Sequence, residues 1–375
     1  MRIVHIITGL GDGGAEGSLY KLCIHDKKNI HSVISLTNFG KYGPLLKSNK
    51  IKVYSIDFKK DLKIFNRFLQ LIGLLKKLNP DFVQTWMYHA DLIGGLASKF
   101  AHKKKVIWGI RCSNLNYKYS NISTIIIIKI NALLSYFIPV KIVSCSFQAK
   151  KIHIKGGYCA SKFVVIPNGF DLNYLNISET MRKDFRREHL KHEDCFLIGM
   201  VARFDKQKDH KSFFKSIYEA KKKLKNIKCV LVGKNMDRSN LNILRWIEKY
   251  ELKNNIILLG SRRDINLIMN GLDLHILSSA YGEGFPNVLA ESMACGTPCI
   301  ATKVGDSEYI LGGSGWIVKP YAYKTIAEKI FIASNETKIE RKKRSFLARS
   351  YIEKNFSIEK MIKNFNNLYS GINIQ

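Results

Sequence analysis

Short apolar runs alternate along the chain with longer segments whose apolar residues recur at helical spacing. Short, continuous apolar runs bounded by glycine, asparagine or charged residues are typical of strands that are buried on both faces of a parallel sheet. In the first half these runs lie at 3–8, 33–37, 52–56, 82–85, 106–109 and 141–146. Helical spacing between them predicts helices such as 64–78 and 92–100. The alternation predicts an α/β domain with a doubly wound parallel sheet and right-handed crossovers.

The second half repeats this pattern. Its predicted strands lie at 196–201, 230–234, 256–260, 272–277 and 298–301. A chain of 375 residues is longer than one hydrophobic core usually serves, so two domains are expected. The first domain is predicted to span residues 1–170 and the second residues 171–355, because Pro167-Asn168-Gly169 follows the last strand pattern of the first half.

The segment 281–298 connects two predicted buried strands and contains the most informative chemistry. Pro286 suits the first turn of a helix, where its missing N–H is no loss, and Gly296 suits the position after the helix end. A helix from about 286 to about 295 is therefore predicted. Glu283 then lies on the loop before this helix and Glu291 within it.

This arrangement favours a ligand that carries both phosphate and sugar. A helix N-terminus offers free N–H groups and partial positive charge, and Gly282 and Gly284 would let a ligand approach the backbone. An isolated carboxylate repels phosphate, but its several acceptor lone pairs suit paired sugar hydroxyls. Glu283 and Glu291 are therefore candidate ligands of sugar hydroxyls.

Two further strand ends carry residues that suit phosphate. The first strand leads into a glycine-rich turn that contains Gly13 and Gly14, at an edge where open α/β sheets bind ligands; a plain tight turn is the alternative. The turn is no dinucleotide fingerprint, because the second strand ends at Thr37 without an acidic residue. Arg203 and Lys208 follow the strand 196–201, where two fixed cations suit a diphosphate, with a solvated loop as the alternative.

Two more candidates follow later strands of the first domain. His89 is predicted to lie in the loop after the strand 82–85, on the same side of the sheet as Gly13 and Gly14. A lone histidine is more often structural, so position alone does not assign it a function. Arg111 ends the next strand at the same edge and is a candidate ligand of an acceptor phosphate.

Three motifs resemble those of the retaining glycosyltransferases of the GT-B fold, family 4. The first is Glu283-Gly-Phe-Pro-Asn287, with Glu291 eight positions after Glu283 and Ala-Cys-Gly-Thr-Pro following. The others are Arg-Phe-Asp-x-Gln-Lys-Asp-His at 203–210 and Tyr-His-Ala-Asp-Leu at 88–92. The resemblance implies two Rossmann-like domains that face each other across a cleft, with residues 356–375 as a helix that crosses back to the first domain.

The resemblance also implies roles for the candidate residues. Glu283 and His89 would be the catalytic residues beside the transferred sugar, and Glu291 would bind the ribose. The donor diphosphate would contact Arg203, Lys208, Gly13 and Gly14. The remaining donor contacts would come from Gly284, Phe285 and Asn287, with the backbone after Glu283 facing the sugar.

The implied reaction moves a hexose or N-acetylhexosamine from a nucleotide-diphosphate sugar, with uridine as the expected base. The acceptor would be a polyprenyl-diphosphate-linked saccharide in O-antigen, capsule or exopolysaccharide biosynthesis. No Asp-x-Asp occurs in the chain, so neither a metal nor another cofactor is expected. Arg203, Lys208 and the helix N-terminus would stabilise the diphosphate instead.

The charge of the chain favours an anionic partner. Lys and Arg number 61 and Asp and Glu 30, a net charge of +31. Residues 1–170 hold 26 basic and 7 acidic residues, so they carry +19 of it. Zinc-finger spacing and basic recognition helices are missing from the sequence, so nucleic acid is not expected as a partner. An anionic membrane surface fits, with a Lys-rich composition that only improves solubility as the alternative.

The expected location is therefore the cytoplasm, peripheral on the inner face of the cell membrane. The N-terminus reads as a first strand rather than a signal peptide, and the eight cysteines lack metal-binding spacing and are expected to be reduced. The very apolar segment 122–140 is interrupted by Lys129 and Pro139 and should not span a bilayer. A buried or half-buried helix is expected there, with an interfacial helix as the alternative.

Two other functions share this architecture. A UDP-sugar 2-epimerase would act on the donor without an acceptor, but the additional acid and base that it needs are missing. A catalytically idle subunit that binds sugar nucleotides or membrane would keep the fold and the charge. Such a subunit should have lost Glu283, Arg203 or Lys208, and this chain retains all three.

Overall fold

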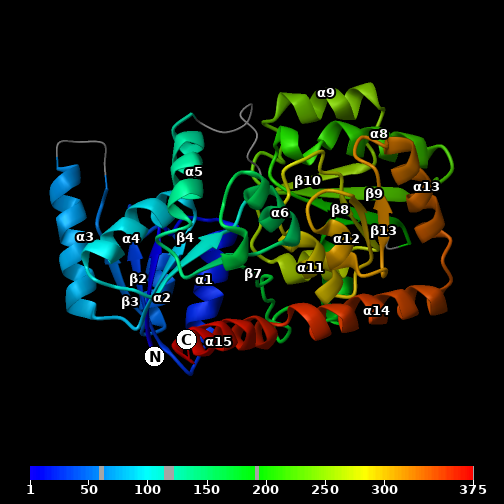
Figure 1. Ribbon diagram of the computed structural model, residues 1–375. Helices are drawn as coiled ribbons and strands as arrows, with labels where there is room; N and C mark the ends of the chain where they lie inside the picture. The colour runs from blue at the N-terminus through cyan, green and yellow to red at the C-terminus, as the bar shows by residue number, and fades with distance from the viewer. Residues whose placement is uncertain (59–62, 114–121, 191–193, 375) are drawn as a thin grey trace. The chain divides into compact units, whose positions relative to one another are not determined.

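The computed structural model describes residues 1–58, 63–113, 122–190 and 194–374 (Figure 1). The chain forms two compact units. Unit 1 comprises Met1–Gly169 and Ile358–Gln375, and unit 2 comprises Phe170–Ser357. The sequence placed these boundaries after residues 170 and 355.

Unit 1 is built on a parallel seven-stranded sheet in the order β3-β2-β1-β4-β5-β6-β7. Its strands are β1 (Arg2–Ile7), β2 (Ile30–Ser35), β3 (Lys52–Ser55), β4 (Phe82–Trp86), β5 (Val106–Ile110), β6 (Lys141–Ser144) and β7 (Phe163–Val165). Its helices are α1 (Gly14–His25), α2 (Tyr42–Ser48), α3 (Ile64–Leu78), α4 (Tyr88–Phe100), α5 (Ile122–Leu134), α6 (Phe147–Lys155) and α15 (Ile358–Ile374), with a short 3-10 helix at Ala160–Lys162.

Both faces of this sheet are covered, because successive side chains of a strand point to opposite sides. On β1, Ile3 and Ile7 belong to a core that also contains residues of α1 and α15. Val4 and Ile6 belong to a second core with residues of α3 and α4. The last helix, α15, is thus part of unit 1, and its Tyr369 donates a hydrogen bond to Gln84 Oε1 at 2.5 Å.

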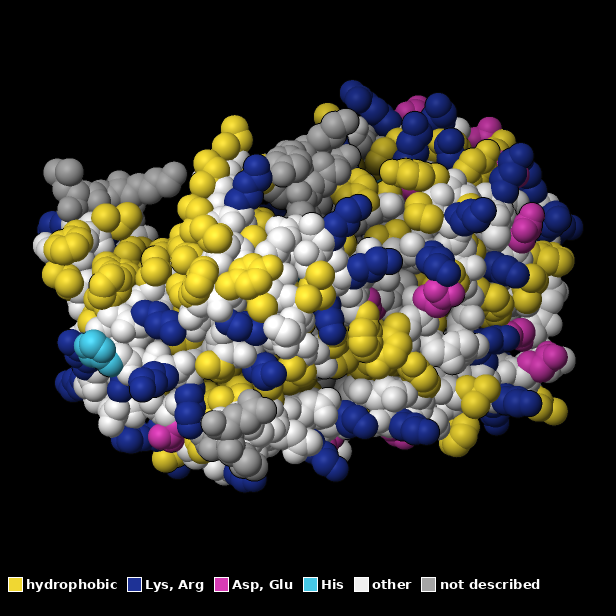
Figure 2. All heavy atoms as spheres, in the orientation of Figure 1, with side chains coloured by type: hydrophobic (Ala, Val, Ile, Leu, Met, Phe, Trp, Pro, Cys, Tyr) yellow, Lys and Arg dark blue, Asp and Glu magenta, His cyan; other side chains and the backbone are white. Residues whose placement is uncertain are grey.

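Helix α5 is buried on one side only. Ile128, Asn131 and Ala132 are buried, whereas the opposite side shows apolar side chains at the surface (Figure 2). The expected half-buried helix is confirmed, but it ends at Leu134 and not near residue 140. None of the helices in the described ranges is long and apolar enough to cross a bilayer.

Unit 2 has a parallel six-stranded sheet in the order β10-β9-β8-β11-β12-β13. Its strands are β8 (Phe196–Val201), β9 (Ile227–Val232), β10 (Ile256–Gly260), β11 (Leu274–Leu277), β12 (Cys299–Thr302) and β13 (Trp316–Val318). Its helices are α7 (Glu179–His189), α8 (His210–Lys221), α9 (Leu241–Lys249), α10 (Ile265–Gly271), α11 (Asn287–Ala294), α12 (Ser307–Leu311), α13 (Tyr323–Ser334) and α14 (Lys338–Phe356), with a 3-10 turn at Lys206–Lys208.

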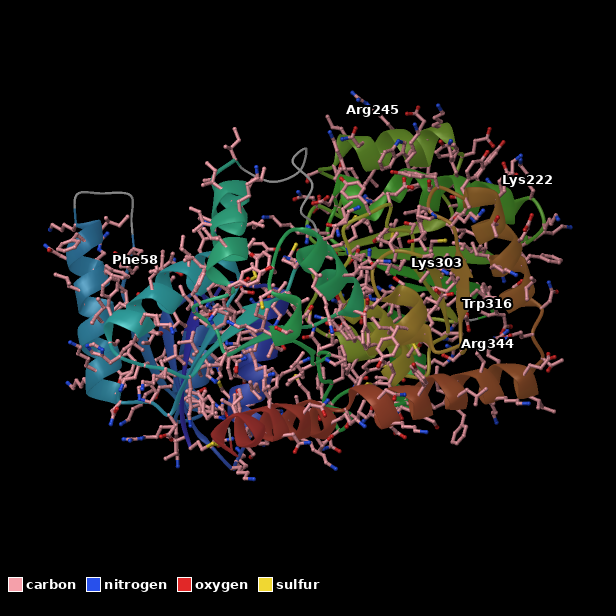
Figure 3. All side chains as sticks on the ribbon, viewed as in Figure 1. Phe58, Lys222, Arg245, Lys303, Trp316 and Arg344 are labelled. Atoms are coloured by element: carbon pink, nitrogen blue, oxygen red, sulfur yellow. The ribbon has the colours of Figure 1, made fainter. Side chains whose placement is uncertain are left out.

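The long helix α14 is anchored to the rest of unit 2 by its arginines. Arg344 stacks over the ring of Trp316 at 4.2 Å, an approach that Figure 3 shows with both side chains labelled. Arg349 donates hydrogen bonds to the carbonyl oxygens of Leu175 and Ala294. The prediction of two Rossmann-like α/β domains is confirmed, while their placement across a cleft stays a prediction.

Each sheet has a topological switch point beside its first strand. β1 and β4 are neighbours, but the chain continues from β1 to β2 on one side and from β4 to β5 on the other. The connections after β8 and β11 diverge in the same way. Ligands of open α/β sheets bind in the crevice that this divergence opens at the carboxyl ends of the strands. Most of the candidate residues predicted from sequence follow β1, β4, β8 and β11.

Candidate active site

The switch point of unit 2 joins the loop after β8 to the loop after β11. Ser278 Oγ donates a hydrogen bond to the carbonyl oxygen of Lys208 at 2.8 Å, and Ala280 N donates to that of Gln207 at 2.8 Å. These bonds bring Lys208 Nζ to 2.5 Å from Glu283 Oε1. Ser279 Oγ donates to the same oxygen at 2.6 Å. Two donors therefore fix the carboxylate of Glu283, although the two charged residues are 75 positions apart.

The Lys208–Glu283 pair lies largely away from solvent. The side chain of Lys208 is 13% exposed and that of Glu283 8%, so each charge depends on the other for compensation. Two buried histidines near Lys208, His210 and His275, are neutral at neutral pH. Burial, together with the charge of Lys208, lowers the pKa of His210 to about 4 and that of His275 to about 3.

Arg203 lies on the same loop but is turned to the surface. Its side chain is 59% exposed, and Nε lies 3.2 Å from Asp205 Oδ2. Its Nη2 donates a weaker bond to Gln207 Oε1 at 3.4 Å. Burial alone would raise the pKa of Asp205, but the bonds from Gln207 N–H and Arg203 lower it. The guanidinium of Arg203 is thus placed near Lys208 in the chain and remains accessible to a ligand.

The loop that carries Glu283 is held from behind by Gly305, which the sequence analysis missed. Gly305 has a φ of +59°, and a Cβ there would lie 2.4 Å from the carbonyl oxygen of Glu283 and 2.7 Å from that of Gly284. Asp306 N donates to the carbonyl oxygen of Gly284 at 3.0 Å. The available signal was a glycine a few residues after the end of a predicted strand, the same signal that drew attention to Gly13.

Helix α11 begins at Asn287, with Pro286 as its N-cap and not inside its first turn. Asn287 and Glu291 lie one helical turn apart on the same face, and both are half-buried. The ring of Phe285 packs against Phe170 and Phe356, with ring centroids 6.2 and 5.4 Å apart. Any contact of Phe285 with a ligand therefore falls to its backbone.

In unit 1, Gly13 and Gly14 form the start of α1 directly after the turn that follows β1. Gly13 is the N-cap, with extended backbone, and its carbonyl oxygen accepts from Gly17 N at 3.0 Å. A Cβ at Gly13 would lie 2.3 Å from Glu16 Oε2. Gly13 and Gly14 add no side chains at the start of this 12-residue helix, but the carboxylate of Glu16 lies beside Gly13, and contact of this turn with a phosphate stays a prediction.

His89 lies in the first turn of α4, and its predicted place in the preceding loop was wrong. The helix starts early because Met87 turns the chain sharply, with φ +75° and ψ 158°, a conformation that is otherwise almost restricted to glycine. Met87 N donates to the carbonyl oxygen of Gly109 at 2.9 Å. Burial lowers the pKa of His89, so the half-buried imidazole is neutral at neutral pH.

Asp91, also in the first turn of α4, is a buried acid that the sequence analysis did not single out. It accepts from Thr85 Oγ1 at 2.5 Å and from Gly109 N at 3.3 Å. Burial raises its pKa to about 8, so its carboxyl group retains a proton at neutral pH. An acidic residue within an otherwise apolar helix pattern was the signal that could have identified it.

Arg111 follows β5 and is held inside unit 1. Its guanidinium lies 4.3 Å from the ring centre of Trp86, and Nη1 donates to Asn168 Oδ1 at 2.8 Å. Ser18 Oγ donates to the same oxygen at 3.1 Å. Within the described part of the chain, Nε and Nη2 of Arg111 are buried without a hydrogen-bond partner. Burial lowers the pKa of Arg111, and an anion or water at this point would satisfy its remaining donors.

One buried cluster could be mistaken for a metal site. His5, Cys23 and His31 place ligand atoms within 4.8 Å of one another, which their positions in the sequence did not reveal. The ring nitrogens of both histidines already take part in hydrogen bonds. His5 bonds Trp86 and His31, and His31 bonds Asp26 in turn. The cluster therefore reads as a hydrogen-bond chain within the core of unit 1.

Two models of glycosyltransferase families match the chain. Residues 181–348 match the family model described as Glycosyl transferases group 1, and residues 12–174 match the model of Glycosyltransferase Family 4. The capsular polysaccharide biosynthesis glycosyltransferase CapM of Staphylococcus aureus is 23% identical over 328 residues, which are 84% of each chain. An Escherichia coli UDP-Gal:alpha-D-GlcNAc-diphosphoundecaprenol alpha-1,3-galactosyltransferase is 26% identical over 270 residues, 68% of this chain and 66% of that one.

Solved structures share the fold over almost the whole chain. The structure of HepE from Anabaena in complex with UDP superimposes with a TM-score of 0.88 at 20% identity, covering 99% of this chain and 100% of that one. A glycosyltransferase from Rickettsia africae gives a TM-score of 0.86 at 20% identity, covering 99% and 98%. At this level of identity the similarity establishes the fold.

Proposed function

Because this chain belongs to the family 4 glycosyltransferases and has the GT-B fold, we propose that it is a retaining enzyme that uses a UDP-linked sugar. It would transfer a hexose or N-acetylhexosamine to a polyprenyl-diphosphate-linked saccharide. The names of two relatives refer to capsular polysaccharide and Vi polysaccharide biosynthesis, and the product of this enzyme would enter an O-antigen, capsule or exopolysaccharide.

The observation that carries the donor assignment is the Lys208–Glu283 pair at the switch point of unit 2. Lys208 offers a fixed cation for the donor diphosphate, and Arg203 can turn in from the surface to grip two of its oxygens. Glu283, oriented by Lys208 and Ser279, would accept hydrogen bonds from sugar hydroxyls. Glu291 would bind the ribose, and the N–H groups at the start of α11 would face the sugar together with the backbone of Gly284.

The acceptor is assigned to unit 1. Gly13, Gly14, His89 and Arg111 all follow strands at the carboxyl edge of its sheet. Arg111 has two buried donors without partners in the described chain, which favours an anionic group such as a lipid diphosphate. The named activities of the Escherichia coli and Campylobacter jejuni relatives involve diphosphoundecaprenol-linked substrates. Such an acceptor would place the enzyme in the cytoplasm, peripheral on the inner face of the membrane.

The proposed transfer retains the anomeric configuration. The bond between the anomeric carbon and the phosphate oxygen breaks, and a bond to the acceptor oxygen forms on the same face. The leaving phosphate oxygen takes the proton of the acceptor hydroxyl. Lys208 and Arg203 would stabilise the negative charge that develops on the diphosphate, so we propose that no metal is needed. Neutral His89 would contact the transferred sugar as it becomes oxocarbenium-like.

A thermal-shift screen without metal, in the presence of a chelator, tests this assignment. Uridine, guanosine and adenosine diphosphates and their common sugar conjugates would be compared on wild type, Arg203→Ala and Lys208→Ala. We expect stabilisation by the uridine compounds that is reduced in both variants. If no nucleotide stabilised the wild-type protein, the result would favour a catalytically idle subunit over a transferase.

A further inference from the structure

Helix α5 of unit 1 carries an apolar stripe on its outer side. The stripe residues are spaced by three or four positions and therefore lie on one face of the helix and of the turn that follows it. They are Ile122, Ile126, Ile130, Leu133 and Phe137, with exposed fractions of 77%, 52%, 41%, 67% and 70%. Side chains of this size are normally buried, and an exposed stripe of them marks an interaction surface.

The stripe continues onto the neighbouring helices. On α3, Ile64, Phe65 and Leu69 are at least half exposed, and Phe100 at the end of α4 is 60% exposed. Phe68 and Phe100 are in edge contact, with ring centroids 5.9 Å apart, which joins α3 to α4. Figure 2 shows apolar side chains gathered over α3, α4 and α5. We call the exposed apolar residues of these three helices the apolar face.

The apolar face borders the edge of unit 1 where the acceptor is expected. In a βα unit the helix runs back along the sheet, so it starts at the carboxyl edge of its strand. The N-terminal ends of α3 and α5 lie at the same end of unit 1 (Figure 1). Ile64, Phe65, Ile122 and Ile126 therefore lie toward the edge that carries Gly13 and His89.

The charge around this face identifies the partner. Residues 92–170, which include α5 and most of α4, contain no Asp or Glu, and Lys99 in the last turn of α4 and Lys129 within α5 lie on the helices that carry the face. Lys162 donates to the carbonyl oxygens of Ser135 and Tyr136 just beyond the end of α5. Two copies of so basic a surface would repel each other. An anionic lipid surface supplies both the negative charge and the apolar phase that this combination needs.

We propose that unit 1 docks on an anionic bilayer through the apolar face, with α5 in the plane of the interface. The stripe side chains enter the boundary between headgroups and acyl chains, and the surrounding lysines contact the headgroups. This inference rests on the proposed function, since it specifies how the enzyme reaches a lipid-linked acceptor. It assigns to α5 the interfacial role that its sequence left open.

Flotation with vesicles tests the docking directly. Vesicles of phosphatidylglycerol and phosphatidylcholine in equal parts are compared with vesicles of phosphatidylcholine alone. The double variant Ile122→Gln, Leu133→Gln removes part of the stripe. The matched control Ile339→Gln, Leu347→Gln changes the same residue types on α14 of unit 2, where they are 80% and 49% exposed. We expect the stripe variant to lower partitioning about tenfold, and the control to stay within about twofold of wild type.

Three results would overturn the proposal. The first is wild-type protein that does not float with the anionic vesicles, and the second is equal loss in stripe variant and control. The third is a stripe that holds two copies together, which size-exclusion chromatography would reveal as a dimer only in wild type. Nucleotide-induced thermal shifts, measured without vesicles on the same proteins, distinguish failure of membrane docking from failure of the proposed function. A docked protein without nucleotide binding would contradict the function alone.

Discussion

Gly305 offers a test of how the Glu283 loop is positioned. Gly305→Ala has two costs. At φ +59° any side chain is strained by about 1–2 kcal/mol. The new Cβ would also lie 2.4 Å from the carbonyl oxygen of Glu283, whereas ordinary contact begins at 3.4 Å. The loop must therefore move by about 1 Å to reach ordinary contact, and overpacking of this kind costs about 1–3 kcal/mol.

Gly313→Ala is a matched control, because it isolates the backbone strain. Gly313 also has a positive φ, +82°, but a Cβ there meets nothing within 4 Å. The control should lose about 1–2 kcal/mol of unfolding free energy and keep its activity within about twofold. Gly305→Ala should lose about 2–5 kcal/mol and about 100-fold in kcat/KM, because a displacement of 1 Å at a reacting group has that effect.

Urea unfolding gives the two stabilities, and release of UDP from the donor gives the two rates. Activity is compared at a temperature where both variants remain folded. If Gly305→Ala transferred sugar as fast as Gly313→Ala, the loop would tolerate the shift. Positioning of Glu283 by Gly305 would then be refuted.

Three further changes test other parts of the structure. Lys208→Met leaves the Glu283 carboxylate buried without its cation and should cost about 3–5 kcal/mol in urea unfolding. Adding Glu283→Gln should restore most of that stability but not donor binding, and a double variant as unstable as the single one would contradict this pairing. Because the pKa of Asp91 is raised in the folded state, the folded protein keeps a proton on this carboxyl group that the unfolded chain releases above about pH 4. The free energy of unfolding should therefore be highest below pH 4 and fall by about 1.4 kcal/mol per pH unit as the pH rises toward 8. Asp91→Asn should flatten this part of the stability–pH profile, and an unchanged slope would show that Asp91 is ionised in the folded protein. Met87→Gly relieves a strained backbone and should raise the unfolding free energy by about 1 kcal/mol, whereas a loss would show that packing of the Met87 side chain outweighs the strain.

The sequence predicted most of the fold because parallel strands buried on both faces leave an unambiguous apolar pattern. The helix predicted at 64–78 is α3 with the same limits, and the first strand differs from β1 by a single residue at each end. The early start of α4 was missed, since no propensity rule places a methionine at φ +75°. Such a conformation depends on the surrounding packing, here on the bond from Met87 N to Gly109.

For the candidate site, too, the sequence predicted what depends on local pattern but not what depends on tertiary packing. Lys208 and Glu283 could be assigned to strand ends, and their contact follows from the adjacency of β8 and β11, which the sequence does not state. Gly305 and Asn168 act through contacts with residues distant in sequence, and Ser279 acts through a bond to Glu283 that depends on how the loop between them folds, so the sequence did not reveal their roles. The exposure of the α5 stripe could not be predicted either, because a helix that is apolar all round has the same sequence pattern whether protein covers one of its faces or both.

The roles of the two acids can be separated by one calorimetric experiment. UDP and the UDP-sugar that gives the largest thermal shift are titrated into wild type, Glu283→Gln and Glu291→Gln, with a chelator present. We predict that Glu291→Gln weakens both ligands by the same factor, because both contain the ribose, and that Glu283→Gln weakens only the UDP-sugar. Equal loss of both ligands in Glu283→Gln, or unchanged binding of UDP in Glu291→Gln, would contradict the proposed donor site.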